Sequence, residues 1–273
     1  MVSHGRGRCG PASFFGGKAS GSFYAGDMTN GKEASKNSIT ISGAGTEVGA
    51  YLIYGAWSRG EISSENSVTI KEGAKVTASG EIAGSLAASK TIKNSVIIDS
   101  ATVTTVGIFG GQSGEASENS VTIKGDAVVT ANGEGINGAA YGKSAIKNEV
   151  NVEDTATIIG SILGGKTGGT ADGNKVNIGK DANIENVPSI TGGNGGNAND
   201  NEVNIGGDTK AVVIAGNGKT GADGNKVKID GNADGAVTGG ISTNGNADGN
   251  NVAIVYEVLS KMVKKNRKEI EED

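Results

Sequence analysis

Residues 119–123 read Asn119-Ser120-Val121-Thr122-Ile123, one of nine copies of a motif in which Asn precedes two aliphatic residues at alternate positions. The copies lie 24 to 29 residues apart. A recurrence at this period is typical of solenoid proteins, in which each repeat forms one turn and contacts only its neighbours. The copies begin at Asn37, Asn66, Asn94, Asn119, Asn148, Asn174, Asn201, Asn225 and Asn250.

Two further signals follow each motif and complete the repeat. One is Ala-x-Val or Ala-x-Ile, as at residues 127–129, and the other is an aliphatic residue closely followed by Gly, as at residues 108–111. Alternate residues of a strand face the same side, so the aliphatic positions of each segment share one buried face. Three short strands per repeat, with Gly and Asn at the corners, predict an all-β fold. We expect a parallel β-helix (β-solenoid) of about nine coils of about 27 residues.

The recurring Asn lies on the inward face of its predicted strand. An Asn amide both donates and accepts hydrogen bonds, so asparagines stacked at one corner would satisfy polar groups that are otherwise buried and unpaired. The alternative is that each Asn only adopts a local turn conformation. We expect a structural ladder formed by all nine asparagines.

The residue after each Asn is predicted to face outward. In four successive copies it is Glu149, Lys175, Glu202 and Lys226. Like charges directly opposite each other on neighbouring strands destabilise a sheet. The alternation therefore predicts that opposite charges face each other along the C-terminal half of the stack.

Composition excludes several classes of function. The net charge of the 273 residues is −5, whereas a nucleic-acid binder needs a basic stripe, so we expect no nucleic-acid partner. A single His (His4) and a single Cys (Cys9) cannot build a Cys/His metal site or a Ser-His-Asp triad. We predict no cofactor, no metal, no catalytic residue and no enzymatic activity. The chain has no apolar run of about 18 residues, and residues 1–17 lack the apolar core of a secretory signal.

The repeat divides the chain into three parts. Residues 34–254 are predicted to form the solenoid, and residues 1–33 an irregular or incomplete first coil. Residues 13–17 (Ser-Phe-Phe-Gly-Gly) are similar to residues 107–111, which predicts that the chain begins partway through a coil. Residues 255–273 are predicted to form a C-terminal amphipathic helix or tail. The helical spacing is carried by Val255, Val258, Leu259, Met262 and Val263.

Residues that occur once in the repeats are better candidates for ligand contact than residues that recur. Trp57 and Arg59 share one Gly-rich segment, predicted to be a loop. An exposed Trp beside an Arg can stack on a sugar ring or anchor a partner. The alternative is a Trp that folds back onto its coil.

Acidic residues recur just before Asn in the later repeats. Stacked carboxylates with nearby amide and carbonyl oxygens suit Ca²⁺, although turn-forming Asp and Asn explain the same pattern. The nonapeptide of calcium-binding β-rolls is not present. The acidic residues are Asp172, Asp200, Asp223 and Asp248.

Residues 108–123 and 162–178, with their Ile-x-Gly-Gly and Asn-x-Val-x-Ile elements, resemble passenger repeats of bacterial autotransporter adhesins. The resemblance implies display on the cell surface or secretion at the bacterial outer membrane. It also implies an adhesive role, with a surface protein or glycan of a host or neighbouring cell as partner. The signal peptide and the translocator of that family are missing from this chain. We therefore expect membrane contact only through a translocator that this chain lacks.

Two other classes of protein remain as alternatives. Asn-Ser-Val-x-Ile also resembles the head repeats of trimeric autotransporter adhesins, although those repeats are about half as long. Polysaccharide lyases and hydrolases also use parallel β-helices, and they need clustered carboxylates with Lys or Arg in one cleft. The sequence shows no local cluster of that kind.

Overall fold

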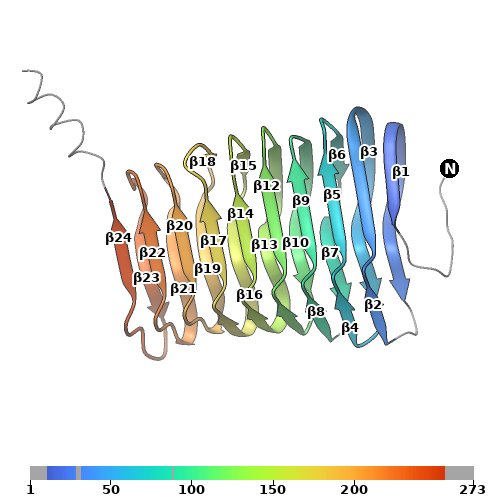
Figure 1. Cartoon of the computed structure of the whole chain (residues 1–273). Coiled ribbons are helices and arrows are strands. Elements are labelled where there is room, and N and C mark those ends of the chain that lie inside the picture. The colour runs from blue at the N-terminus through green and yellow to red at the C-terminus, as the bar shows by residue number, and fades with distance from the viewer. Residues whose placement is uncertain (1–10, 29–31, 88, 256–273) are drawn as a thin grey trace, which may run out of the picture.

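The computed structural model describes residues 11–28, 32–87 and 89–255. These residues form 24 β-strands that pair in parallel and wind into coils, which lie side by side along the stack in Figure 1. This pairing confirms the predicted all-β parallel β-solenoid of about nine turns. The strands are β1 (Ala12–Met28), β2 (Glu33–Ser35), β3 (Ser38–Ser58), β4 (Ile62–Ser64), β5 (Ser67–Lys71), β6 (Lys75–Ala78), β7 (Glu81–Ala87), β8 (Lys90–Ile92), β9 (Ser95–Asp99), β10 (Thr102–Gln112), β11 (Glu115–Ser117), β12 (Ser120–Lys124), β13 (Val128–Ile146), β14 (Glu149–Val152), β15 (Thr157–Ile159), β16 (Ile162–Asp172), β17 (Lys175–Ile178), β18 (Asn183–Asn186), β19 (Ser189–Asn197), β20 (Glu202–Ile205), β21 (Val212–Gly221), β22 (Lys226–Ile229), β23 (Val237–Ser242) and β24 (Asn251–Ile254).

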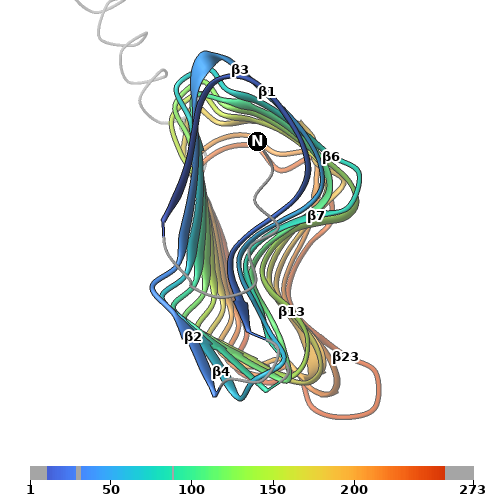
Figure 2. The same cartoon turned by 90° about the vertical axis from the view of Figure 1, so that its right-hand side faces the viewer.

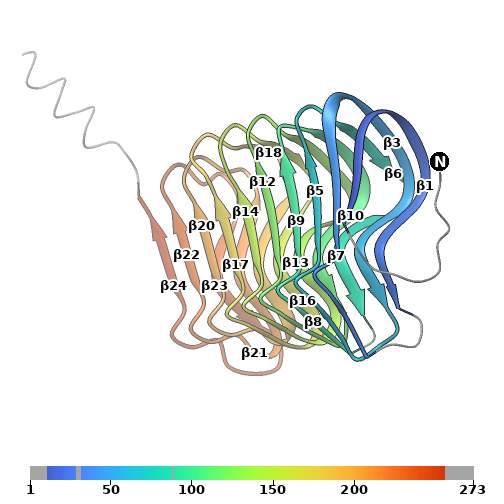
Figure 3. The same cartoon turned by 45° about the vertical axis from the view of Figure 1, so that its right-hand side comes forward.

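Strands of successive coils align in rows. The first row follows the recurring Asn and runs from the start of β3 through β5, β9, β12, β14, β17, β20 and β22 to β24 (Figure 3). Its register joins equivalent motif positions, so that Val68 pairs with Ile39 on one side and Val96 on the other. The second row includes β6, β15 and β18, and the third includes β7, β16, β19, β21 and β23. The unbroken register of the first row keeps each of its side chains above its counterpart, whereas β15–β18 of the second row contains a register shift.

A fourth row of short strands lies where the sequence predicts only a loop. It contains β2, β4, β8, β11 and the end of β13, which pair in parallel just before each Asn. The middle residue of each strand is small and buried, as at Ala34, Ser63, Thr91 and Ala116. A three-residue strand with a small buried centre carries almost no hydrophobic periodicity, so the prediction of three strands per repeat is one short.

The core follows from the alternation within the first three rows. First-row strands alternate between partly exposed and buried residues, and their aliphatic side chains point inward. The second inward position is Ile41, Ile70, Ile98 and Ile123 in four successive coils, and all four are fully buried. Burial of an Ile side chain contributes about 1.5–3 kcal/mol. Stacked aliphatic columns are therefore the main source of stability of the array.

Each coil narrows to a waist where the third row approaches the first, as seen along the stack in Figure 2. Glycine occupies most of this waist, where an added side chain would meet backbone atoms of the first row and of the next coil. A Cβ added at Gly110 would lie 2.5 Å from the carbonyl oxygen of Gly138 and 2.7 Å from the backbone nitrogen of Ser120. Gly55 and Gly84 meet equivalent atoms of their own neighbours. The waist separates the aliphatic core from the part of the coil that contains the Asn column.

Residues 12–28 belong to the stack, and their predicted alignment is wrong. β1 pairs in parallel with β3 from Ala12 to Met28, with two register shifts. Phe14 pairs with Ile41, a first-row position, whereas the similarity of residues 13–17 to residues 107–111 would place it in the third row. The third-row position is taken by Phe23, which pairs with Ile53. Inward packing decided the register, because the rings of Phe14 and Phe23 lie 5.0 Å apart over the end of the core.

The predicted C-terminal helix lies outside the described residues. The last described strand, β24, ends at Ile254, where the predicted solenoid ends. Of the residues that carry the helical spacing, only Val255 is described, and it is exposed and outside any strand.

Candidate functional site

The nine recurring asparagines form one column of side-chain hydrogen bonds. The Nδ2 atom of each Asn donates to the Oδ1 atom of the Asn in the next coil over 2.8–3.1 Å, from Asn37 through to Asn250. The backbone N–H of each Asn donates to the same Oδ1 atom. In the coils from Asn66 to Asn201, Nδ2 also donates to the fourth-row carbonyl of the preceding coil, as in Asn119 to Thr91 at 3.0 Å. Both donors and both acceptor positions of a central amide are thus used within the stack.

The residue before each Asn forms the corner that makes this geometry possible. It has a positive φ of 52–66° in all nine coils, the left-handed region that ordinary side chains seldom adopt. Gly occupies this corner in only three coils, at Gly173, Gly224 and Gly249. The sequence gives little sign of this corner, because Lys and Glu occupy most of the other positions.

The acidic residues before the later asparagines do not form the single column that the sequence suggests. Asp172, Asn199, Asp223 and Asp248 share one column, in which Oδ1 of each of the first three accepts the backbone N–H of the next member at 2.7–3.2 Å. Asp200 instead occupies the left-handed corner, with φ 52°. The ladder fixes the position of each coil at its Asn. Asp200 directly precedes its Asn, whereas the other three Asp residues lie two residues before theirs. The described residues contain no group of three or more His, Cys, Asp or Glu side chains that could hold a metal ion.

Opposite charges face each other in the first row, as predicted. The Nζ atom of Lys175 lies 3.0 Å from Oε2 of Glu202, with both side chains partly exposed. Beside them runs a second, outward ladder, in which Asn204 donates to Asn177 and Asn177 to Asn151 at 2.9–3.0 Å. A hydrogen bond from Asn204 lowers the pKa of Glu202 below 4.5, partial burial opposes this, and Lys175 lowers the pKa further.

Glu202→Lys should lower the free energy of unfolding by about 0.5–1 kcal/mol, because the new cation would face Lys175 and Lys226. The lowered pKa of Glu202 means that its contribution is present above pH 4.5 and is lost as the pH falls below that value. Urea unfolding at neutral pH and near pH ~3 measures both effects. If the free energy of unfolding and its salt dependence are the same in Glu202→Lys as in the parent, the charge alternation has no role in stability. Lys210→Glu, at a more exposed pair with Glu185, is the matched control and should change little.

Trp57 does not lie in a loop. It is part of β3, where it pairs with Leu86 of the next coil, and its side chain is half-buried. The ring of Tyr24 lies 5.6 Å from that of Trp57 and 5.8 Å from that of Tyr54. The exposed Arg59 guanidinium lies 5.6 Å from the Trp57 ring. The structure therefore keeps the predicted Trp57–Arg59 pair together and adds tyrosines from two coils.

These side chains belong to an aromatic cluster, which we define as Tyr24, Tyr54, Trp57, Phe109 and Tyr141. It packs with Leu52 and Leu86 and is separate from the main core. Tyr54 and Phe109 both pair with Ala83 in the third row, so the cluster lies on that wall of the stack. The Tyr141 ring lies 5.7 Å from that of Phe109. Individual repeats do not reveal the cluster, because each coil contributes only one or two of its residues and the parallel register brings them together.

Two carboxylates accompany the aromatic cluster. Oε2 of Glu81 accepts hydrogen bonds from the Tyr54 hydroxyl and the Gln112 amide, both at 3.0 Å. Oε2 of Glu134 accepts from Nζ of Lys166 at 3.2 Å, and this Nζ also lies 5.6 Å from the Tyr141 ring. Acidic, basic, amide and aromatic groups thus meet on one wall.

The environment sets the charge state of these groups. Burial, then the Glu81 carboxylate, raises the pKa of the Tyr54 phenol. Burial and a hydrogen bond to Glu134 raise the pKa of Tyr141, and the same bond followed by that from Lys166 lowers the pKa of Glu134. At neutral pH the tyrosines are therefore neutral donors and Glu134 is ionised.

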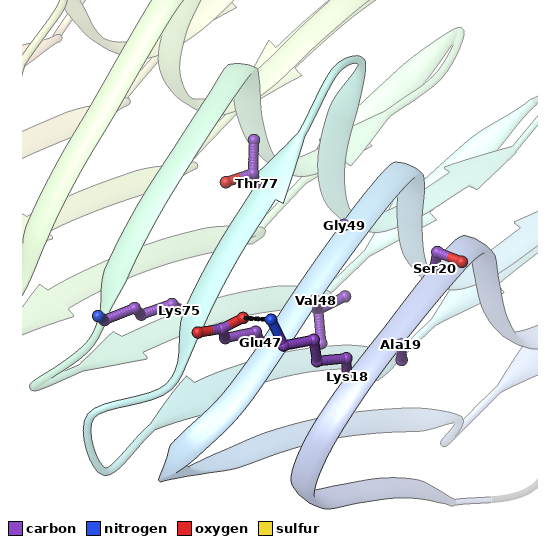
Figure 4. A pocket seen from close by; sticks show the side chains of 8 residues that line it. All are labelled: Lys18, Ala19, Ser20, Glu47, Val48, Gly49, Lys75 and Thr77. Carbon is purple, nitrogen blue, oxygen red and sulfur yellow. Dashed lines mark ion pairs between the residues drawn. The ribbon is translucent and has the colours of Figure 1, made fainter.

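A shallow surface depression lies apart from the aromatic cluster, in the first coils of the stack. It is lined by Lys18, Glu47, Lys75 and Thr77 from three successive coils, with Lys18 and Glu47 paired at 2.8 Å (Figure 4). Both paired side chains are at least half exposed, so the pair contributes little to stability. The depression has no aromatic or buried polar side chain among its lining residues, and it is the weaker candidate for a ligand site.

Among the described residues, none forms a helix that is long and apolar enough to cross a membrane. No protein-family model, curated protein sequence or solved structure matches the chain.

Proposed function

We propose that the chain is a non-enzymatic adhesin of the passenger type, whose solenoid presents a binding surface to a host or neighbouring cell. The observation that supports this proposal is the distribution of polar and aromatic side chains over the coils. The asparagines that recur in every coil are used in hydrogen bonds between coils, whereas five aromatic side chains that do not recur gather on one wall with charged groups. Such a division gives a rigid stack and a specific patch, which suits recognition. On this proposal the protein acts at the cell surface or outside the cell.

Beads coated with the full chain should retain cells of at least one type from a panel of bacterial and animal cells. Retention should exceed that on beads coated with heat-denatured chain several-fold, because the patch exists only in the folded stack. Microscopy with a shear wash measures the attachment. Equal retention on native and denatured chain would refute an adhesive role.

A polysaccharide lyase or hydrolase is the second candidate. The observation in its favour is that Glu81 and Glu134 accompany one aromatic cluster, because such enzymes use paired carboxylates beside the sugar. Glu81 is held by two hydrogen bonds and Glu134 by a lysine, so we favour a positioning role for both. Assays for new reducing ends and for unsaturated products, with Glu81→Gln and Glu134→Gln as controls, separate the two classes. If the parent chain releases product and either variant abolishes that release, the protein is an enzyme and the non-enzymatic adhesin is rejected.

A further inference from the structure

We infer that the aromatic cluster binds an uncharged carbohydrate chain, laid across neighbouring coils. This inference rests on the proposed function and names the chemical class of its ligand. Four properties of the wall lead to it: accessible aromatic rings, a strained tyrosine, unpaired buried acceptors and a balanced charge.

The aromatic rings offer apolar faces of the kind on which sugar rings stack. Tyr141 is 49 % exposed, and Trp57 and Tyr24 are half-buried, so parts of all three rings remain accessible. The ring planes of Tyr24 and Trp57 are inclined by only 31°, with the ring centroids 5.6 Å apart. Aromatic side chains combine apolar area with a polar edge, which matches a ligand with C–H faces and hydroxyl rims.

Tyr141 is held in an unfavourable backbone conformation. Its φ is 64°, the left-handed region, which a bulky side chain rarely adopts. The other non-glycine residues with positive φ in the described chain are Lys, Glu, Ser or Asp. Strain of this kind persists where the surrounding structure imposes it, and it concentrates at binding sites. In this conformation the Tyr141 ring lies 5.7 Å from the Phe109 ring and 5.6 Å from Nζ of Lys166.

Two buried amide oxygens beside the cluster have no hydrogen-bond partner among the described residues. They are Oε1 of Gln112, which is 2 % exposed, and Oδ1 of Asn137, which is fully buried. Gln112 is next to Leu86 in the sheet, and Asn137 is next to Phe109. A buried unpaired acceptor is costly, so a donor that reaches it, directly or through a water, is favoured. Because both oxygens are buried, a sugar hydroxyl pairs with them through a bridging water or after a side chain moves, and an apolar ligand offers neither donor.

The charges of the wall balance and favour an uncharged ligand. Glu81 and Glu134 are matched by Lys166 and Arg59, and both cations lie 5.6 Å from aromatic ring centroids. A cationic ligand would compete with them, and an anionic one would approach the two carboxylates. The groups come from six successive coils between Tyr24 and Lys166. At about 4.8 Å per coil they cover roughly 24 Å, enough for an extended oligosaccharide.

Trp57 is the only Trp of the chain, so its fluorescence reports on the cluster directly. We expect at least one of a set of neutral hexasaccharides, made of glucose, mannose, galactose or N-acetylglucosamine, to change its emission saturably. Oligogalacturonate, an anionic probe, should not. Tyr141→Gly should weaken binding about threefold to tenfold, which corresponds to loss of one aromatic stack. The same variant should melt close to the parent, because Gly relieves the positive φ while the ring contacts are lost.

Phe15→Ala is the matched control, since Phe15 is 69 % exposed on β1 at a first-row position outside the cluster, and it should bind as the parent does. The inference is overturned if no neutral hexasaccharide changes the emission, or if Tyr141→Gly binds as tightly as Phe15→Ala. Cell attachment that is equal for these two variants would also overturn it, while leaving the adhesive function intact. If the parent chain and both variants all fail to attach to cells, the proposed function itself is rejected.

Discussion

Asn119→Ala is expected to lower the free energy of unfolding by about 3–5 kcal/mol, far more than a typical surface substitution. The reason is the number of buried groups that lose a partner together. The backbone N–H and the amide of Asn94 both donate to Oδ1 of Asn119, and the Asn119 amide donates to Thr91 and Asn148. Each buried group left unpaired costs about 1–3 kcal/mol.

Two control variants separate hydrogen bonding from size and position. Ser120→Ala removes an outward hydroxyl from the next residue and should change stability by less than ~0.5 kcal/mol. Asn119→Asp keeps the volume but cannot donate when ionised, so it should destabilise at least as much as Asn119→Ala at neutral pH. Urea unfolding followed by circular dichroism gives the midpoints. Equal midpoints for Asn119→Ala and Ser120→Ala would mean that the asparagines act only in local turns.

The shape of the transition is a second readout of Asn119→Ala. Coils contact only their neighbours, so a weakened junction divides the stack into two parts with separate stabilities. We expect the unfolding curve of the variant to broaden or to split into two steps. A parallel shift with unchanged slope would show that the stack unfolds as one unit even with a broken ladder.

Gly110→Val should prevent the central coils from folding, with a loss of more than about 4 kcal/mol. The first side-chain carbon would lie 2.5 Å from the Gly138 carbonyl oxygen and less than 3 Å from backbone atoms of Ser120. Backbone on both sides belongs to hydrogen-bonded rows, so neither can move without breaking the sheet. The three atoms nearest to the added carbon are backbone atoms, so no flexible side chain can move aside to make room.

Gly168→Val is the matched control for the waist, because a Cβ at Gly168 would have no atom within 4 Å. It should lower stability by less than ~1 kcal/mol. The waist itself accepts Ala at two places, Ala25 and Ala215, which pair at positions equivalent to those of Gly55 and Gly192. Comparable melting temperatures for Gly110→Val and Gly168→Val would show that the two rows are not in rigid contact.

The sequence was sufficient for the array but not for its details. Strict alternation around Val121 and Ile123, repeated nine times, determines strands and stacking, because a shift by one residue would turn the inward aliphatic positions of the first row to solvent. The sequence did not predict the fourth row of strands, because the buried residues of that row are as small as Ala116 and Ala34. The register of β1 was misjudged because Phe14-Phe15 matches Ile108-Phe109 in residue type, whereas packing over the core end placed Phe14 beside Ile41.

The candidate site was only partly foreseeable. Trp57 and Arg59 drew attention as residues that do not recur, and the structure places them at one end of the aromatic cluster. Glu81, Phe109 and Tyr141 are unremarkable within their own repeats. They meet because the coils stack in register at a spacing of about 4.8 Å, a three-dimensional relation that no single repeat records. Residues of this kind become visible only when corresponding positions of successive coils are compared.

The asparagine ladder has a consequence for how such a gene can change. Every link joins an amide to the same atoms of the next coil in the same direction, so duplication or deletion of a whole coil leaves no mismatched joint. Beyond Lys166, recombination that adds or removes two coils at a time would change the length of the rod and also keep opposite charges facing each other along Lys175, Glu202 and Lys226. Between Tyr24 and Lys166 the same event would pull the aromatic cluster apart. The stack thus combines a region in which whole pairs of coils can be exchanged with a block in which the same exchange would separate side chains that now touch.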